Sequence, residues 1–165
     1  MVAEPGAEPR WLSDDERAAW LANSAIMISL PAALDARMRR ESELTFFEYM
    51  VLSVLSEEPT RTMQMSDLAA RTSASLSRLS HVVGRLEKRG LLARARIPGS
   101  GRRTATTLTE AGHEAVVAAA PGHVAAVREY LIDRLGPDEL TALRRIGSAV
   151  AAAVDCPSPG PTSEG

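Results

Sequence analysis

The sequence has few of the features that mark secreted or membrane-spanning proteins. Its 165 residues include a single cysteine, Cys156, which excludes an internal disulfide. No uninterrupted apolar run approaches about 18 residues, and the first ten residues carry acids where a secretory signal needs basic and apolar residues. Aromatic residues make up only 4% of the chain, so aliphatic side chains must supply the core. These scarcities predict a cytoplasmic protein with no membrane partner.

Motifs for catalysis and metal binding are also missing from the sequence. It contains no phosphate-binding loop, no Gly-x-Ser-x-Gly motif and no convincing pairing of a nucleophile with a base. The histidines His81, His113 and His123 fall in different segments, without a cysteine or paired acids at ligand spacing. We therefore expect no enzymatic activity, no metal site and no cofactor.

Positive charge, in contrast, is concentrated in the middle of the chain. The overall net charge is −2, yet residues 61–103 contain ten basic and two acidic residues, a net charge of +8. The remaining residues therefore carry a net charge of −10. A basic middle between acidic arms indicates a polyanion as the partner of the middle segment. The plainer alternative is a basic face that is merely solvated.

Apolar spacing and capping residues predict a mostly helical chain. Ser13 with Glu16, and Thr45 with Glu48, have the spacing of capping boxes. The first helix should run from the first of these to about residue 40, with a kink at Pro31. Further helices are expected within residues 44–57, 64–73, 73–90, 109–135 and 136–154. A Pro-Gly pair at 121–122 should kink the helix over 109–135 or divide it in two.

The helices over 64–73 and 73–90 are joined by small polar residues, which is typical of a helix-turn-helix. The second helix has an apolar face formed by Leu76, Leu79, Val82, Val83 and Leu86. The opposite face should enter the major groove of DNA, where an arginine can pair with guanine and serines with phosphates or bases. We predict that the DNA-binding residues of this recognition helix are Ser75, Ser77, Arg78, His81 and Arg85. The alternative is an ordinary solvent-exposed face, and for His81 in particular a histidine without a DNA role.

Residues 91–109 alternate between apolar and polar positions and predict a β-hairpin. Strands are expected over 92–97 and 104–108, joined by a Pro-Gly-Ser-Gly turn. A hairpin directly after a recognition helix forms a wing, and basic residues at its tip can enter the minor groove. We predict that Arg102 does so and that Arg94 and Arg96 bind phosphates, with Arg103 as a further wing contact. A purely structural hairpin is the alternative.

The most distinctive stretch is "SLSRLSHVVGRLEKRGLLAR", followed by a turn, Arg102 and "LTEAG". Together with the weaker "LTFFEYMVLSVLSE", "MSDLAA" and "APGHVAAVR", it resembles the MarR family of bacterial transcription regulators from about residue 13 to 154. The resemblance implies a mainly α fold with a small β-hairpin wing, in which a winged helix-turn-helix is joined to a helical dimerisation lobe. It also implies a homodimer that represses genes at a near-palindromic double-stranded DNA site and is released by a small, often phenolic or anionic, ligand.

We accordingly expect five segments along the chain. Residues 11–44 form the N-terminal helix of the dimerisation lobe, 45–108 the DNA-binding lobe, and 109–154 the C-terminal helices of the dimerisation lobe. Residues 1–10 and 155–165 are expected to be disordered tails. One departure concerns the wing, where the family commonly has Asp-x-Arg and this chain has Ser100-Gly101-Arg102. The aspartate that helps to orient this arginine in the family is therefore absent beside Arg102.

Dimerisation also has support from the residues themselves. The terminal helices are rich in aliphatic residues, including "AVAAAV" at 149–154, more than a small winged helix can cover. An intrachain helical lobe is the alternative. A small aromatic or anionic ligand could lie near Phe47, Tyr49 and His123, although aromatic residues at helical spacing more often belong to a core. A ligand- or protein-binding module that kept the fold but lost DNA binding is a second functional hypothesis. An RNA-binding winged helix is a third, but this chain lacks the aromatic residues that would be expected to stack on single-stranded bases.

Overall fold

The computed structural model describes residues 9–97, 99 and 103–154. The predicted contacts at Arg102, the neighbouring Ser100 and Gly101, the lone Cys156 and most of both predicted tails lie outside these residues. Contacts divide the chain into two compact units, residues 1–33 and 34–165, with the division inside the first helix. The predicted lobe boundaries at 44/45 and 108/109 stay predictions.

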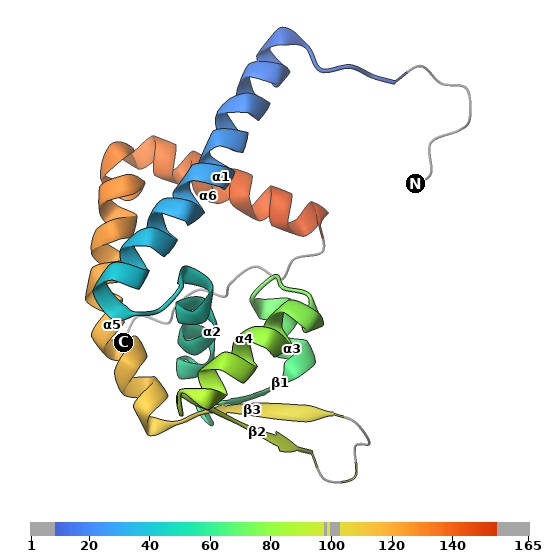
Figure 1. The fold of residues 1–165 in the computed structure, drawn as a ribbon. Coiled ribbons are helices and arrows are strands. Elements are labelled where there is room, and N and C mark those ends of the chain that lie inside the picture. Colours follow the sequence, from blue (N-terminus) through green and yellow to red (C-terminus); the bar gives the residue numbers. More distant parts are fainter. Residues whose placement is uncertain (1–8, 98, 100–102, 155–165) are drawn as a thin grey trace. The chain divides into compact units, whose positions relative to one another are not determined.

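The described residues form a mostly helical fold with a small antiparallel sheet (Figure 1). The predicted hairpin is present, with Leu92 opposite Leu108 and Arg96 opposite Thr104. A third strand, which the sequence analysis missed, pairs with the same central strand, so the strand order is β1-β3-β2. The elements in chain order are α1 (Asp14–Ser42), α2 (Phe46–Ser56), β1 (Thr62–Gln64), α3 (Met65–Arg71), α4 (Leu76–Lys88), β2 (Leu92–Arg96), β3 (Thr104–Leu108), α5 (Glu110–Tyr130), the short 3₁₀-helix η1 (Ile132–Arg134) and α6 (Pro137–Ala153).

Local signals place the helix ends where the sequence predicts them. Ser13 and Glu16 bond reciprocally at the start of α1, and Thr45 and Glu48 do the same at the start of α2, with N···O distances of 2.8–3.2 Å. Gly90, just after α4, has the left-handed φ of +73° that such a helix end favours. Both capping boxes are thus confirmed. Of the two alternatives for residues 121–122, a division into two helices is wrong, because α5 is one continuous helix with Pro121 inside it; a kink at this position stays a prediction.

The core of the DNA-binding lobe is aliphatic. Leucines of α2, α3 and α4 are almost fully buried, and they include Leu52, Leu55, Leu68, Leu79 and Leu86. One predicted position of the apolar face is not buried: Leu76, the first residue of α4, is 56% exposed. Burial of the remaining apolar face turns the opposite face of α4 outward.

Gly112 lets the start of α5 approach the strand β2 closely. A Cβ atom at this position would lie 2.1 Å from the Leu91 carbonyl oxygen. The preceding Thr109 donates its backbone N–H to the same carbonyl at 3.2 Å and its hydroxyl to the Gly90 carbonyl at 2.7 Å. The motif "LTEAG" therefore joins α5 to the end of the recognition helix.

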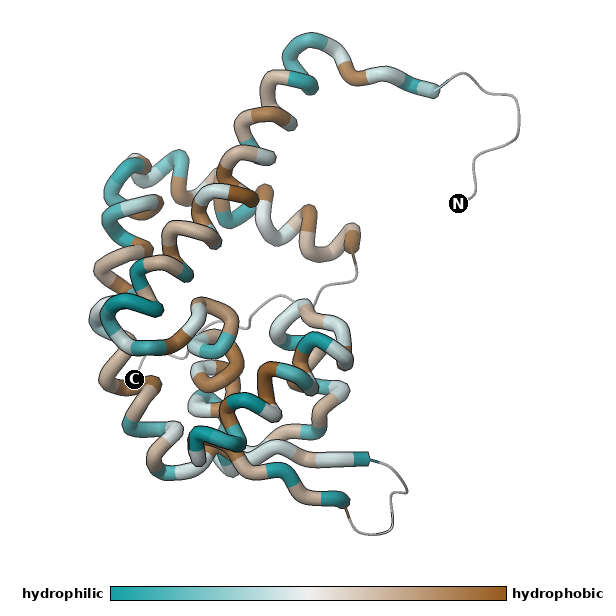
Figure 2. The backbone as a smooth tube through the Cα atoms, in the orientation of Figure 1, coloured by the Kyte–Doolittle hydropathy of each residue, from teal (hydrophilic) through white to brown (hydrophobic). Residues whose placement is uncertain are grey.

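The terminal helices contain many apolar residues (Figure 2), and several of these residues are exposed. Leu34 and Met38 are the buried residues of α1, and α6 buries none of its side chains. The most apolar 18-residue window of α1 has a mean hydropathy of 1.2, and 6% of it is buried. By length and composition alone, α1 could therefore cross a membrane, although it contains no uninterrupted apolar run of about 18 residues.

Candidate nucleic-acid interface

The recognition helix presents all five predicted residues to solvent. Ser75 is the N-cap of α4, and its hydroxyl accepts the backbone N–H of Arg78 at 3.2 Å. Ser77, Arg78 and His81 extend from the next two turns without an ion pair to any described residue. Because α3 and the apolar face of α4 bury the opposite side, this surface is free to meet a large polyanion.

Arg78 lies on an aromatic ring. Its guanidinium carbon is 4.2 Å from the ring centroid of Phe47, a half-buried residue of α2. A guanidinium over an aromatic face gains a cation–π interaction. The contact favours one orientation of the Arg78 side chain while leaving the residue exposed. Phe47, predicted as a ligand residue, is thus placed beside the predicted guanine reader.

Arg85 is bound to a buried carboxylate. Its Nε and Nη2 both donate to Oε1 of Glu48 at 3.2 Å, and Glu48 is only 5% exposed. Burial raises the pKa of the Glu48 carboxyl, but hydrogen bonds from Thr45 and Arg85 outweigh burial, so the pKa lies below its ordinary value. The pair ties α4 to the start of α2. Sequence reasoning assigned Glu48 to capping alone, because its contact with α4 spans 37 residues.

A shallow groove of about 320 Å³ runs beside this surface. It lies between the end of α1, the start of α2 and the outward face of α4. Arg39 contributes a further exposed cation, held by Asp35 at 2.6 Å. The lining residues are Asp35, Arg39, Thr45, Phe47, Arg78, His81, Val82 and Arg85.

The three described wing arginines differ in their contacts. Arg94 donates from Nε and Nη2 to the carboxylate of Glu87 at 2.9 and 2.6 Å. Arg96 and Arg103 are exposed and have no ion pair within the described residues. The three arginines are therefore not equivalent. Arg94 is paired with an acid, whereas Arg96 and Arg103 have no acidic partner among the described residues.

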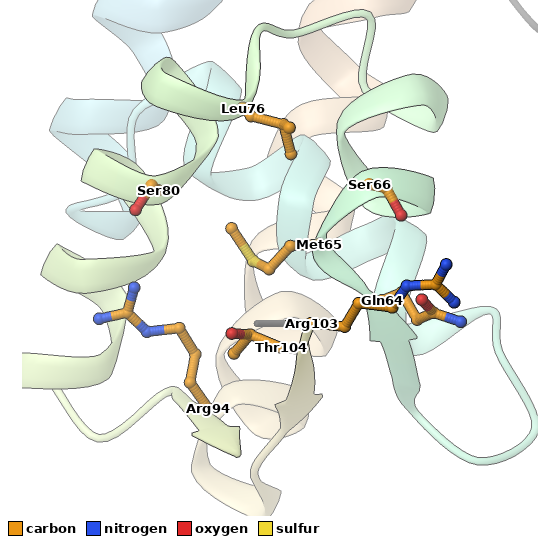
Figure 3. Close-up of a pocket in the computed structure, with 8 residues that line it drawn as sticks. All are labelled: Gln64, Met65, Ser66, Leu76, Ser80, Arg94, Arg103 and Thr104. Carbon is orange, nitrogen blue, oxygen red and sulfur yellow. The ribbon is translucent and has the colours of Figure 1, made fainter. Parts of the chain in front are cut away.

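A second hollow, of about 350 Å³, lies between the wing and the helix-turn-helix (Figure 3). Met65 and Leu76 supply its apolar side chains, whereas Arg94 and Arg103 line opposite edges of it, with their side chains extending in different directions. The exposed Leu76 thus faces this hollow instead of the core. The remaining lining residues are Gln64, Ser66, Ser80 and Thr104.

The predicted ligand residues come together only in part. His123 of α5 packs against Tyr49, with ring centroids 4.5 Å apart, and stacks on Phe46 at 5.8 Å. Phe46, and not Phe47, completes this cluster because consecutive residues of α2 face different sides. Burial lowers the pKa of His123, and its buried Nδ1 has no hydrogen-bond partner among the described residues.

Comparisons with known proteins agree on one family. A sequence model of the MarR family matches residues 42–103. The chain is 35% identical to Sco3205, a MarR family transcriptional regulator from Streptomyces coelicolor solved in complex with DNA; the match covers 94% of this chain and 96% of Sco3205, with a TM-score of 0.85. AbsC, a MarR family regulator from the same organism, is 37% identical over 89% of this chain and 99% of its own, with a TM-score of 0.82.

A more distant structure shares the fold alone. BpsR from Bordetella bronchiseptica, whose DNA binding is regulated by 6-hydroxynicotinic acid, is 23% identical, with 82% of this chain and 99% of BpsR covered and a TM-score of 0.71. No functionally curated protein matches this chain.

Proposed function

Since this chain belongs to the MarR family of DNA-binding transcriptional regulators, we propose that it is a homodimeric repressor of a near-palindromic operator. In this proposal α4 enters the major groove and the wing enters the adjacent minor groove. The observation that carries it is the outward face of α4, where all five predicted contact residues are exposed within a segment of net charge +8. The DNA-bound state of the similar Sco3205 supports the same use of this fold.

The predicted DNA-binding residues differ in whether they also form bonds that hold the protein fold together. Ser77, Arg78 and His81 are free to contact bases, whereas Arg96 and Arg103 are free to bind phosphates. Ser75 and Arg85 carry structural bonds as well, the first as a helix cap and the second to Glu48. We propose that Ser75 and Arg85 contact the DNA backbone from these fixed positions. Arg102 remains the proposed minor-groove residue.

A second copy of the chain is the proposed partner of the terminal helices. Ile146 and Val150 of α6 are 47% and 58% exposed, although α6 is 17 residues long and buries no side chain. Burying an aliphatic side chain of this size contributes roughly 1.5–3 kcal/mol. An operator with two half-sites and a two-fold symmetric protein fit each other. The same association accounts for the apolar composition of α1.

We also propose a ligand that regulates DNA binding. The supporting feature is the cluster of Phe46, Tyr49 and His123, in which a buried ring nitrogen has no hydrogen-bond partner in the described part of the chain. Aromatic rings and an unsatisfied imidazole nitrogen suit a small aromatic molecule that has a hydrogen-bonding or anionic group. Phe46 takes the place of Phe47 in this part of the proposal, because Phe47 contacts Arg78.

Selection of bound duplexes from a random DNA pool, with the purified full chain, tests the proposed function. The expected result is a near-palindromic consensus whose half-sites lie about one helical turn apart, about 10–10.5 base pairs. A consensus with a single half-site would contradict the dimeric arrangement. Failure to enrich any sequence at low salt would contradict DNA recognition and favour a ligand- or protein-binding module that kept the fold.

A further inference from the structure

One carboxylate joins the wing to the recognition helix. Glu87, in the last turn of α4, accepts from the Arg94 side chain through Nε at 2.9 Å and Nη2 at 2.6 Å. It also accepts the Arg94 backbone N–H at 3.3 Å. Three donors of one wing residue therefore converge on one helix residue, which restrains both the side chain and the strand.

The path of the Arg94 side chain depends on the surface of α4. The helix has no side chain at Gly84, and a Cβ there would lie 3.8 Å from Nη2 of Arg94. The guanidinium thus runs back from β2 across the helix, and Figure 3 shows it extending toward α4. As a result, the Arg94 side chain is only 32% exposed and lies against the body of the lobe.

The rest of β2 has few other attachments to that body. Leu92 is the buried residue of the strand, and none of the four residues that follow it is buried. Beyond Leu92, the strand β2 is held by its pairing with β3, which in turn pairs with β1, and by the Arg94–Glu87 pair. Loss of this pair should therefore change where the wing lies relative to α4 more than it changes the stability of the core.

The negative charge of Glu87 bears on whether Arg94 can bind phosphate. Residues 61–103 contain only two acids, and an acid beside a DNA-binding surface repels phosphates. An arginine committed to phosphate binding would be better placed without that acid. Hydrogen bonds with Arg94 lower the pKa of the Glu87 carboxyl, which keeps the pair ionised.

We propose that Arg94 is a positioning residue that binds Glu87 to hold the wing in register with the recognition helix, and that it is not a phosphate contact. The inference rests on the proposed DNA-binding function and replaces the role that the sequence suggested for Arg94. A wing already held at the correct distance from α4 loses less conformational freedom when both elements enter their grooves. Arg96 and Arg103, which lack an acidic partner among the described residues, then supply the wing's charge to DNA.

The test measures affinity for the duplex recovered from the random pool, by fluorescence anisotropy over a series of salt concentrations. The variants are Arg94→Gln, Glu87→Gln, both together, and the exchange Glu87→Arg with Arg94→Glu. Arg96→Gln is the matched control, because it removes the other arginine of β2. Unfolding curves of each variant confirm that the fold is kept.

If Arg94 positions the wing, the variants should show a specific pattern of DNA affinities. Arg94→Gln and Glu87→Gln should each weaken binding about 5-fold, the double variant should be no weaker than either, and the exchange should restore affinity. The salt dependence should stay unchanged in Arg94→Gln but lose about 0.9 in log–log slope in Arg96→Gln. Tighter binding by Glu87→Gln, together with a reduced slope in Arg94→Gln, would overturn the proposal and restore a phosphate role.

Hydrogen exchange of the free protein separates this proposal from the function itself. In Arg94→Gln the amides of β2 and β3 should exchange faster, while those of α2 and α3 keep their rates. Unchanged exchange in the wing would overturn the positioning role even if the protein binds DNA. If no duplex is enriched, the proposed function fails, and the exchange experiment still decides whether Glu87 holds the wing.

Discussion

At the scale of single residues, the arginines of this surface have different roles because their partners differ. Arg78 stacks on Phe47, Arg85 binds the buried Glu48 and Arg94 binds Glu87. Arg96, only two residues from Arg94, has no ion pair with any described residue. A count of basic residues therefore describes the electrostatic attraction to DNA, whereas the partners determine which side chains can contact it.

Replacing Arg78 with alanine should reduce both affinity and base discrimination. A bidentate arginine–guanine contact is worth about 1–3 kcal/mol, so binding to the selected operator should weaken by that amount. Anisotropy titrations against operators with single base changes would show the expected loss of preference at one position. Arg96→Ala is the control, since its loss should be similar on every sequence; equal losses for Arg78→Ala on all operators would contradict base readout.

Replacing Glu48 with glutamine should destabilise the protein mainly at neutral pH. Because the pKa of Glu48 is lower in the folded state, its ionised form adds stability above the ordinary carboxyl pKa, and this is lost as pH falls through the folded pKa. Urea unfolding should show a cost of about 1–3 kcal/mol at pH 7 that shrinks below about pH 4. Exposed Glu114→Gln is the control. A pH-independent cost would contradict the ionised pair.

At the scale of elements, the junction between the wing and α5 is closely packed and joined by hydrogen bonds. Thr109 caps α5, bonds the Gly90 carbonyl and precedes Gly112, where α5 meets the Leu91 carbonyl. The end of the recognition helix, the base of β2 and the start of α5 therefore share one small contact. A bulky residue there should move all three elements.

The substitution Gly112→Ala should destabilise the fold, whereas Gly147→Ala should not. An alanine at 112 would place Cβ 2.1 Å from the Leu91 oxygen, and overpacking of this kind costs about 1–3 kcal/mol or more. At 147, inside α6, no described atom outside the neighbouring residues and the backbone of the helix lies within 4 Å of an added Cβ, so alanine should stabilise the helix by about 0.5–1 kcal/mol. Thermal unfolding of both variants should show shifts of opposite sign; a neutral Gly112→Ala would contradict the close approach.

At the scale of the whole molecule, the terminal helices carry exposed apolar residues, and the proposed partner of these helices is a second copy of the chain. The exposed apolar residues of α6 and the composition of α1 both fit burial against a second copy. Such an arrangement would place two recognition helices on one duplex. The DNA-binding lobe, in contrast, has a continuous buried core, to which Met38 of α1 and Val116 and Ala119 of α5 also contribute.

Charged residues on the exposed apolar face of α6 should therefore separate the dimer. We expect Ile146→Glu with Val150→Glu to sediment as a monomer in analytical ultracentrifugation, while the wild type sediments as a dimer. The control Thr141→Glu, on the opposite side of α6 from Val150, should remain dimeric. A dimeric double variant would contradict burial of α6 in the interface.

Local sequence signals were sufficient for much of this protein. The capping boxes at 13–16 and 45–48, the two strands of the hairpin and the outward face of α4 follow from side-chain spacing within a few residues. The family could also be recognised, because its motifs are continuous stretches of chain. The three-residue strand β1 could not, since it exists only through its pairing with β3, more than 40 residues away.

The roles of individual side chains depended on which elements meet. Spacing could not show that Glu48 binds Arg85 or that Leu76 faces a hollow beside the wing. It also could not show that Phe46, and not Phe47, reaches His123. Periodicity identifies the buried side of a helix, but an ion pair or a ring contact requires the position and rotation of a second element. The packing of α2, α4 and the wing supplies that information, and it places the guanidinium of Arg94 against the carboxylate of Glu87.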